Sequence, residues 1–151
     1  MAVDSKYIKE LESRVGIEGP PLIYEVERGM IRRFVQAVGD TNPLWQDDEY
    51  AEEKGYSGII APPTFILTLG FDQLQQVLTP SSSVTVLHGS TELECYQQVR
   101  PGDVITVTIM IKNVRERQSK IGRAVFITLN IEYKNQKQEA VAVCRQMLII
   151  Y

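Results

Sequence analysis

The second half of this chain alternates apolar and polar residues with the period of a β-strand. Residues 104–114 and 124–133 place an apolar side chain at every second position. Because successive side chains of a strand point to opposite faces, each stretch would give a sheet one apolar face. Turns over 119–122 and 135–138 join these stretches to each other and to a last strand over 140–151, which predicts antiparallel pairing. The alternating apolar residues are Ile105, Val107, Ile109, Ile111, Val125, Ile127, Leu129 and Ile131.

A helix that follows Pro62 and Pro63 is expected to lie against this sheet. Its first turns are apolar around nearly the whole circumference, and a helix that is apolar on all sides must be buried. The residues concerned are Phe65, Ile66, Leu67, Leu69, Phe71, Leu74, Val77 and Leu78. A loop is expected over 79–83, followed over 84–99 by one long strand or by two, broken near Gly89. These features predict an α+β fold in which an antiparallel β-sheet wraps around one long buried helix.

The chain has the length of one domain. Its 151 residues are expected to form a single domain over 1–151, with an N-terminal helical extension over 1–16. Asp4 can cap the start of this extension and Gly16 can end it. Apolar residues at helical spacing over 31–38 predict a further amphipathic helix.

Composition and charge exclude several classes of function. A net charge of −3 argues against nucleic-acid binding, and no apolar run is long enough to span a membrane. The first residues lack the apolar stretch of a signal peptide, so a cytoplasmic location is expected. Cys95 and Cys144 are far apart, which predicts reduced, packed thiols and no metal site. We expect no metal and no cofactor.

Five short segments occur in a fixed order within about residues 24–103. They are 25–34, 39–44, 61–65, 87–92 and 99–103. In this order they resemble the MaoC-like hot-dog dehydratases and hydratases, which act on enoyl or 3-hydroxyacyl thioesters. The resemblance implies the hot-dog fold. It also implies a degenerate N-terminal type, the non-catalytic subunit, because one of the two catalytic residues of the family is replaced.

Catalytic members of that family carry an Asp and, five residues further on, a His. Here Asp40 is present, but Trp45 stands in the His position. An indole can donate one hydrogen bond but cannot act as a general base. The start of the central helix would also have to stabilise the enolate oxygen, and prolines donate nothing, so Thr64 is the first available donor.

The resemblance assigns candidate site residues to two groups. The catalytic group is a vestigial Asp40, Trp45 in the His position, and Asn42. The substrate-binding group is Pro63, Thr64, Phe65 and His88, the only histidine of the chain. Four of them have an ordinary alternative: Asp40 and Asn42 as turn formers, Trp45 as a core residue, pocket wall or dimer seam, and His88 as a strand residue.

A basic cluster surrounds the hairpin at 119–122. It either is a solvated surface or meets coenzyme A phosphates or an acidic carrier protein. Its residues are Lys112, Arg115, Arg117, Lys120 and Arg123.

Three functions remain open from the sequence. The first is a non-catalytic subunit of an enoyl-thioester hydratase or 3-hydroxyacyl-thioester dehydratase, which forms the acyl pocket with a catalytic MaoC-like chain. The second is a self-sufficient homodimeric hydratase or thioesterase that uses Asp40. The third is an acyl-thioester binding module. Each predicts an acyl-coenzyme A or acyl carrier protein thioester as ligand and a dimer, homomeric or heteromeric, because an exposed sheet edge needs a partner.

Overall fold

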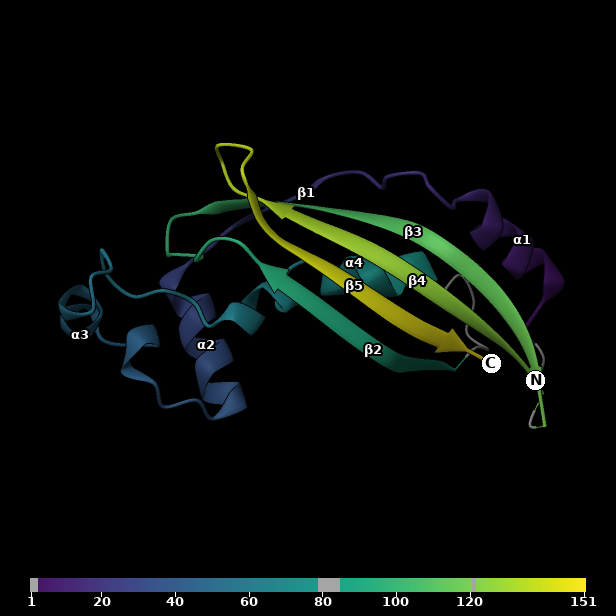
Figure 1. The fold of residues 1–151 in the computed structure, drawn as a ribbon, viewed down its shortest axis with the longest axis horizontal. Coiled ribbons are helices and arrows are strands. Elements are labelled where there is room, and N and C mark those ends of the chain that lie inside the picture. The colour runs from purple at the N-terminus through teal and green to yellow at the C-terminus, as the bar shows by residue number, and fades with distance from the viewer. Residues whose placement is uncertain (1–2, 79–84, 121) are drawn as a thin grey trace.

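A computed structural model of the chain describes residues 3–78, 85–120 and 122–151 (Figure 1). The loop expected over 79–83 lies outside these residues. Five strands form one antiparallel sheet in the order β1-β3-β4-β5-β2. Their bounds are Leu22–Glu25 (β1), Val86–Cys95 (β2), Val104–Ser119 (β3), Gly122–Lys134 (β4) and Ala140–Ile150 (β5).

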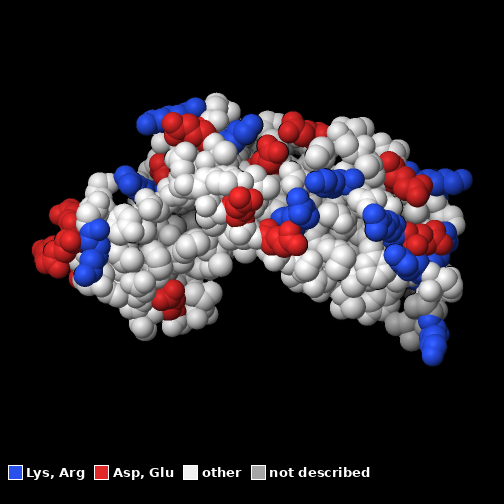
Figure 2. Space-filling model, in the orientation of Figure 1, with Lys and Arg blue, Asp and Glu red and all other residues white. Residues whose placement is uncertain are grey.

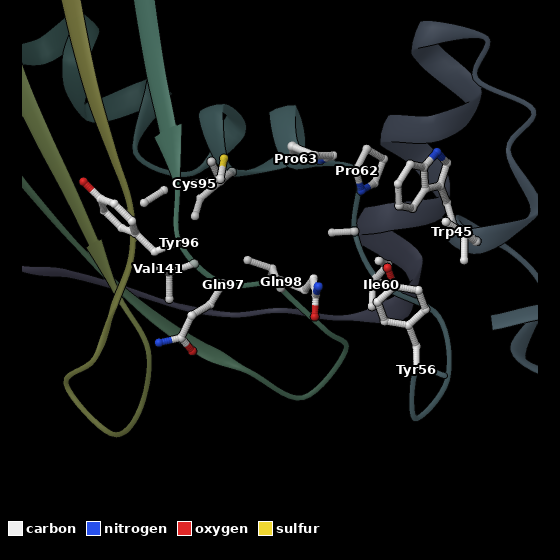
Figure 3. A pocket seen from close by; sticks show the side chains of 15 residues that line it. Trp45, Tyr56, Ile60, Pro62, Pro63, Cys95, Tyr96, Gln97, Gln98 and Val141 are labelled. Atoms are coloured by element: carbon white, nitrogen blue, oxygen red, sulfur yellow. The ribbon is translucent and has the colours of Figure 1, made fainter. Parts of the chain in front are cut away.

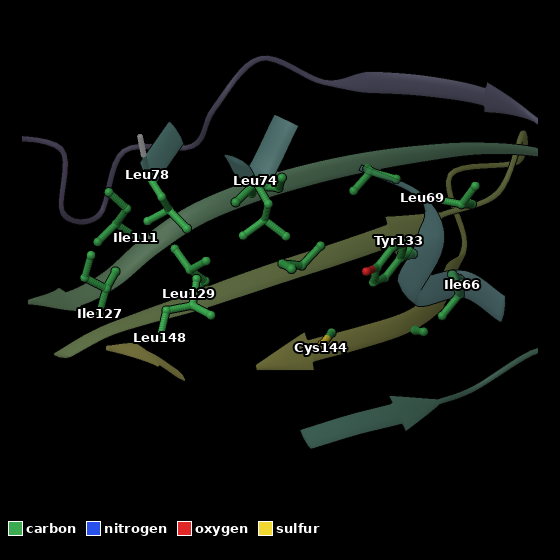
Figure 4. Packing of buried hydrophobic residues seen from close by; sticks show 14 of the residues in the cluster. Ile66, Leu69, Leu74, Leu78, Ile111, Ile127, Leu129, Tyr133, Cys144 and Leu148 are labelled. Atoms are coloured by element: carbon green, nitrogen blue, oxygen red, sulfur yellow. The ribbon is translucent and has the colours of Figure 1, made fainter. Parts of the chain in front are cut away.

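The inner face of this sheet is the one that the alternating pattern predicts. All eight alternating residues of β3 and β4 are buried, and they pack with Cys144, Leu148 and Ile150 of β5. Figure 4 shows this face meeting Leu74 and Leu78 from the helical segment. The expected α+β fold, an antiparallel sheet around a helical segment, is confirmed.

The helical segment itself is divided into two pieces. A 3-10 helix, η2 (Pro63–Thr68), is followed by the α-helix α4 (Phe71–Leu78). Gly70 lies between them with φ +84°, and a Cβ there would stand 3.2 Å from Cγ1 of Val107. The chain therefore turns sharply where it comes closest to β3, so the expected single long helix is interrupted. As a result Phe71 points outward and is 59% exposed.

The N-terminal extension covers the sheet where α4 ends. Helix α1 (Ser5–Ser13) begins at Asp4, whose carboxylate accepts a hydrogen bond from the Lys6 N–H at 3.0 Å. Its inner face buries Tyr7, Ile8 and Leu11, and the Tyr7 hydroxyl donates a hydrogen bond to the Leu78 carbonyl. The helix ends three residues before Gly16, because the chain then forms a parallel bridge from Val15 to β3.

A small lobe of helices stands at the other end of the sheet (Figure 1, left). It consists of α2 (Arg28–Val38), the 3-10 helix η1 (Pro43–Trp45) and α3 (Asp48–Glu53). Gly39 ends α2 with φ +69°, a left-handed conformation that glycine adopts without strain. The loop that leaves this glycine contains the Asp40 and Trp45 positions.

Candidate functional site

Two successive side-chain turns shape the loop after α2. The Asp40 Oδ1 accepts the Asn42 N–H at 2.9 Å, and the Asn42 Oδ1 accepts the Leu44 N–H at 3.1 Å. Asn42 thereby caps the 3-10 helix η1, which Pro43 begins. Short polar side chains that bond the backbone two residues ahead are typical of such turns. Asn42 therefore has a turn-forming role here.

The same loop brings Asp40 and Trp45 together. The Trp45 indole Nε1–H donates to the Asp40 Oδ2 at 2.9 Å. Both carboxylate oxygens of Asp40 are thus hydrogen-bond acceptors within its own loop. The five-residue spacing places the two side chains face to face, as the sequence pattern suggests, with an indole in place of an imidazole.

A pocket of about 310 Å³ opens beside this loop (Figure 3). Trp45, Tyr56 and the two prolines form one wall, and the chain from Cys95 to Val99 forms the opposite wall. Among the described residues that line it, none is a histidine, a carboxylate, a lysine or an arginine. Cys95 is exposed, but partial desolvation by the neighbouring walls raises the pKa of its thiol above the ordinary value, so this group stays protonated near neutral pH. The lining offers aromatic and amide contacts but no general base.

The backbone next to the pocket is also short of donors. The Ile60 N–H donates to the Leu44 carbonyl at 3.2 Å, and the Ala61 N–H donates to the Val99 carbonyl at 2.8 Å. Pro62 and Pro63 follow and carry no N–H. Stabilising a developing enolate oxygen needs an aimed donor, which residues 60–63 do not provide, and Thr64, the next residue with an N–H, lines a different surface.

The four expected substrate-binding residues do not meet at this pocket. Pro63 lines it, whereas Thr64 is exposed on a separate apolar surface. Phe65 is only 1% exposed and packs edge-on against Phe34, with ring centroids 5.8 Å apart, so it belongs to the core. His88 lies on another groove, where its Nε2 is 2.7 Å from the Thr91 hydroxyl. Successive residues of a 3-10 helix point in different directions, which is why 63, 64 and 65 separate.

Several pocket residues were not predicted from the sequence. Tyr56, Tyr96, Gln97 and Gln98 all line the pocket. The two glutamines directly precede the 99–103 segment, and this position is the feature of the sequence that could have indicated their place in the site. Their meeting with Trp45 depends on how the lobe and the sheet pack.

The basic cluster lies far from the pocket, at the hairpin end of β3 and β4, where Figure 2 shows lysine and arginine gathered. None of its five residues, all of which the structure describes, lines the pocket beside Trp45. Arg123 also pairs with Glu116 at 2.5 Å and holds the pKa of that carboxyl below its usual value. The cluster therefore takes no part in the lining of the pocket beside Trp45.

The sheet, the helical segment and the loop define a hot-dog domain of the hydratase and dehydratase class. The family described as "FAS1-like, dehydratase domain region" matches residues 13–144. The chain belongs to this MaoC-like hot-dog dehydratase family.

Similar proteins agree with this assignment. A UPF0336 protein of Streptomyces avermitilis is 40% identical over 109 residues, 69% of this chain and 73% of that protein. A probable enoyl-CoA hydratase alpha subunit of Thermomonospora curvata is 28% identical over 137 residues, 80% of this chain and 43% of that protein. The HadBC (3R-hydroxyacyl-ACP dehydratase) complex of Mycobacterium tuberculosis contains a chain with the same fold, at a TM-score of 0.76, 23% identity and coverage of 90% and 96%.

No group of three or more metal-ligating side chains occurs within the described part of the chain. In the same residues, no helix has the length and apolar character needed to cross a membrane.

Replacing Asp40 by alanine is expected to destabilise this loop. The change removes the acceptor of two hydrogen bonds in a half-buried setting, so the free energy of unfolding should fall by about 1–2 kcal/mol. Urea unfolding measures the loss. The fluorescence of Trp45, the only tryptophan, should change as well. An exposed control, Glu52→Ala, should stay within about 0.5 kcal/mol, and equal losses in both variants would contradict a role for Asp40 in the loop.

Proposed function

We propose that this chain is the non-catalytic subunit of an enoyl-thioester hydratase or 3-hydroxyacyl-thioester dehydratase. It would form the acyl pocket together with a catalytic MaoC-like chain. The observation that carries the proposal is the hydrogen bond from the Trp45 indole to Asp40. Adding water to an enoyl thioester requires a group that accepts a proton from that water. In this loop the second position of the catalytic pair holds a group that only donates.

The unpaired edge of strand β2 supports assembly with a second chain. Strand β2 bonds only to β5, so its other edge is unpaired within the residues that the structure describes. A long open edge presents unpaired backbone N–H and C=O groups, which can pair with a second chain. Apolar side chains border this edge: Leu87 is 47% exposed and Phe71 is 59% exposed. Val38, which is 57% exposed, lines one apolar hollow together with Phe71.

The relatives are consistent with a heteromeric arrangement. One protein similar to this chain is named as an alpha subunit of an enoyl-CoA hydratase, and chains of the same fold occur in the ChsH1-ChsH2 and HadBC complexes. We propose a MaoC-like partner that retains both the Asp and the His, and an acyl-coenzyme A or acyl carrier protein thioester as substrate. A cytoplasmic location remains a prediction.

The activity of the isolated chain tests this proposal first. We expect the purified chain to hydrate crotonyl-coenzyme A, and to hydrolyse acyl-coenzyme A, no faster than its Asp40→Asn variant does, since the pocket lacks a base. Hydration or hydrolysis that depends on Asp40 would instead establish a self-sufficient enzyme.

The complex provides the second arm of the test. With a MaoC-like chain that has Gly-Asp-x-Asn-Pro-x-His, we expect hydration to appear and to stay within about twofold when this chain carries Asp40→Asn. The matching Asp→Asn change in the partner should lower kcat by about 10²–10⁴-fold. An equal loss from both substitutions would show that Asp40 takes part in the chemistry.

A further inference from the structure

A second, larger cavity lies along the inner face of β2. This groove of about 560 Å³ runs between α4 and strands β2 and β5. Most of its lining is apolar: Leu67, Phe71, Leu74, Leu78, Val86 and Leu148. His88 and Gln146 are the exceptions, and no lysine, arginine, aspartate or glutamate is present among the lining residues described. An apolar cavity with a few converging polar groups is the usual form of a small-molecule site.

A β-bulge determines where His88 points. The pairing of β2 with β5 shifts register between His88 and Ser90. In a regular strand, residues three apart point to opposite faces. The extra residue at Gly89 instead places His88 and Thr91 on the same face, with the His88 Nε2 2.7 Å from the Thr91 Oγ1. Thr91 is paired with Gln146, so the three polar side chains adjoin.

Glycine leaves room for a close backbone approach at the centre of this bulge. A Cβ at position 89 would lie 2.8 Å from the Met147 Cε and 3.0 Å from the Met147 carbonyl oxygen. A larger residue at position 89 would therefore require the Met147 side chain and the neighbouring backbone of β5 to move. Bulges of this kind turn individual side chains toward sites. Here the result is that the only histidine of the chain faces an apolar groove.

The groove lies on the same strand face as the pocket beside Trp45. Cys95 lines that pocket, and Leu93 and Thr91 follow on the same inner face of β2. Four residues of strand, about 13 Å, separate Cys95 from Thr91. A chain-like ligand could thus extend from one cavity into the other.

We propose that His88, Thr91 and Gln146 form a specificity site for an acyl group that carries a hydroxyl or carbonyl oxygen along an otherwise apolar body. This inference rests on the proposed acyl-binding function. Imidazole, hydroxyl and amide groups can each donate or accept a hydrogen bond, and none needs a charged partner. A plain alkyl chain would remove from water the hydrogen-bonding positions that the His88–Thr91 contact does not use, which is unfavourable. Sites built to bond an oxygen discriminate strongly against analogues that lack it.

Binding to the full chain tests the site. The probes are octadecanoyl-coenzyme A and its isomers with a hydroxyl at carbon 10 or carbon 12, compared by isothermal titration calorimetry. We expect at least one hydroxylated thioester to bind about tenfold more tightly than the plain one, the size of one or two hydrogen bonds. His88→Leu and Thr91→Val should each reduce this preference to about twofold or less. Ser90→Ala, on the opposite face of the strand, should leave it unchanged.

The outcomes separate the two proposals. Equal affinities for plain and hydroxylated thioesters, or a preference that survives both His88→Leu and Thr91→Val, would overturn the specificity site and leave the acyl-binding function standing. A folded chain that binds none of the thioesters, alone or in complex with the MaoC-like partner, would overturn the specificity site, whereas the hydration measured for that complex decides the subunit role separately. Circular dichroism of each variant establishes that it is folded.

Discussion

Replacing Phe71 by glutamate is expected to prevent assembly with the catalytic partner. Phe71 is 59% exposed at the start of α4, beside the open edge of β2. A large aromatic side chain at the centre of an interface typically contributes about 2 kcal/mol or more, and a buried unpaired charge adds a further penalty. The dissociation constant should therefore rise at least about 100-fold, and hydration by the mixture should fall with it. Analytical ultracentrifugation of the two chains measures the assembly.

A charge on the other edge of the sheet is the matched control. Ile23 is 69% exposed on β1, the strand at the opposite edge. Ile23→Glu should leave the dissociation constant unchanged. Neither variant should alter the free energy of unfolding of the isolated chain by more than about 0.5 kcal/mol, because both positions are exposed. If Ile23→Glu disrupted assembly and Phe71→Glu did not, the interface would lie on the β1 side.

Replacing Phe65 by alanine is expected to cost about 3–5 kcal/mol of unfolding free energy. The side chain is buried, and its ring packs edge-on against Phe34 at an interplanar angle of 83°. The loss combines the transfer of a phenyl ring to water with the cavity that it leaves. Such a loss is a large part of the total stability of a domain this size. Urea unfolding followed by circular dichroism measures it.

Phe71→Ala is the control for Phe65→Ala, since the same side chain is removed six residues further on from an exposed position. It should change the unfolding free energy of the isolated chain by no more than about 0.5 kcal/mol. The pair also tests the role of Phe65, which the sequence pattern associated with substrate binding. A stable Phe65→Ala variant with weakened thioester binding would restore that role.

The spacing of Asp40 and Trp45 in the sequence predicted that their side chains meet, because only short-range turns connect the two residues. Two side-chain turns and a 3-10 helix connect the residues, and each depends only on its immediate neighbours. The rest of the site could not be predicted from neighbouring residues in the sequence. Tyr56 and Gln97 reach the pocket from segments far apart in the sequence, so their meeting depends on the packing of the lobe against the sheet.

The sequence by itself determined the sheet and its inner face. A period of two residues belongs to the strand alone, and any sheet built from these strands must bury Ile105, Val125 and their alternates on one side. The tertiary structure decided what that face meets. The helical segment breaks at Gly70, where a Cβ would stand 3.2 Å from the Val107 side chain of β3, and His88 faces the groove because β2 has a bulge at Gly89, close to Met147. The irregularity near Gly89 was predicted from the sequence, but the residues that Gly70 and Gly89 approach, Val107 and Met147, lie in distant segments, and a local pattern cannot encode such contacts.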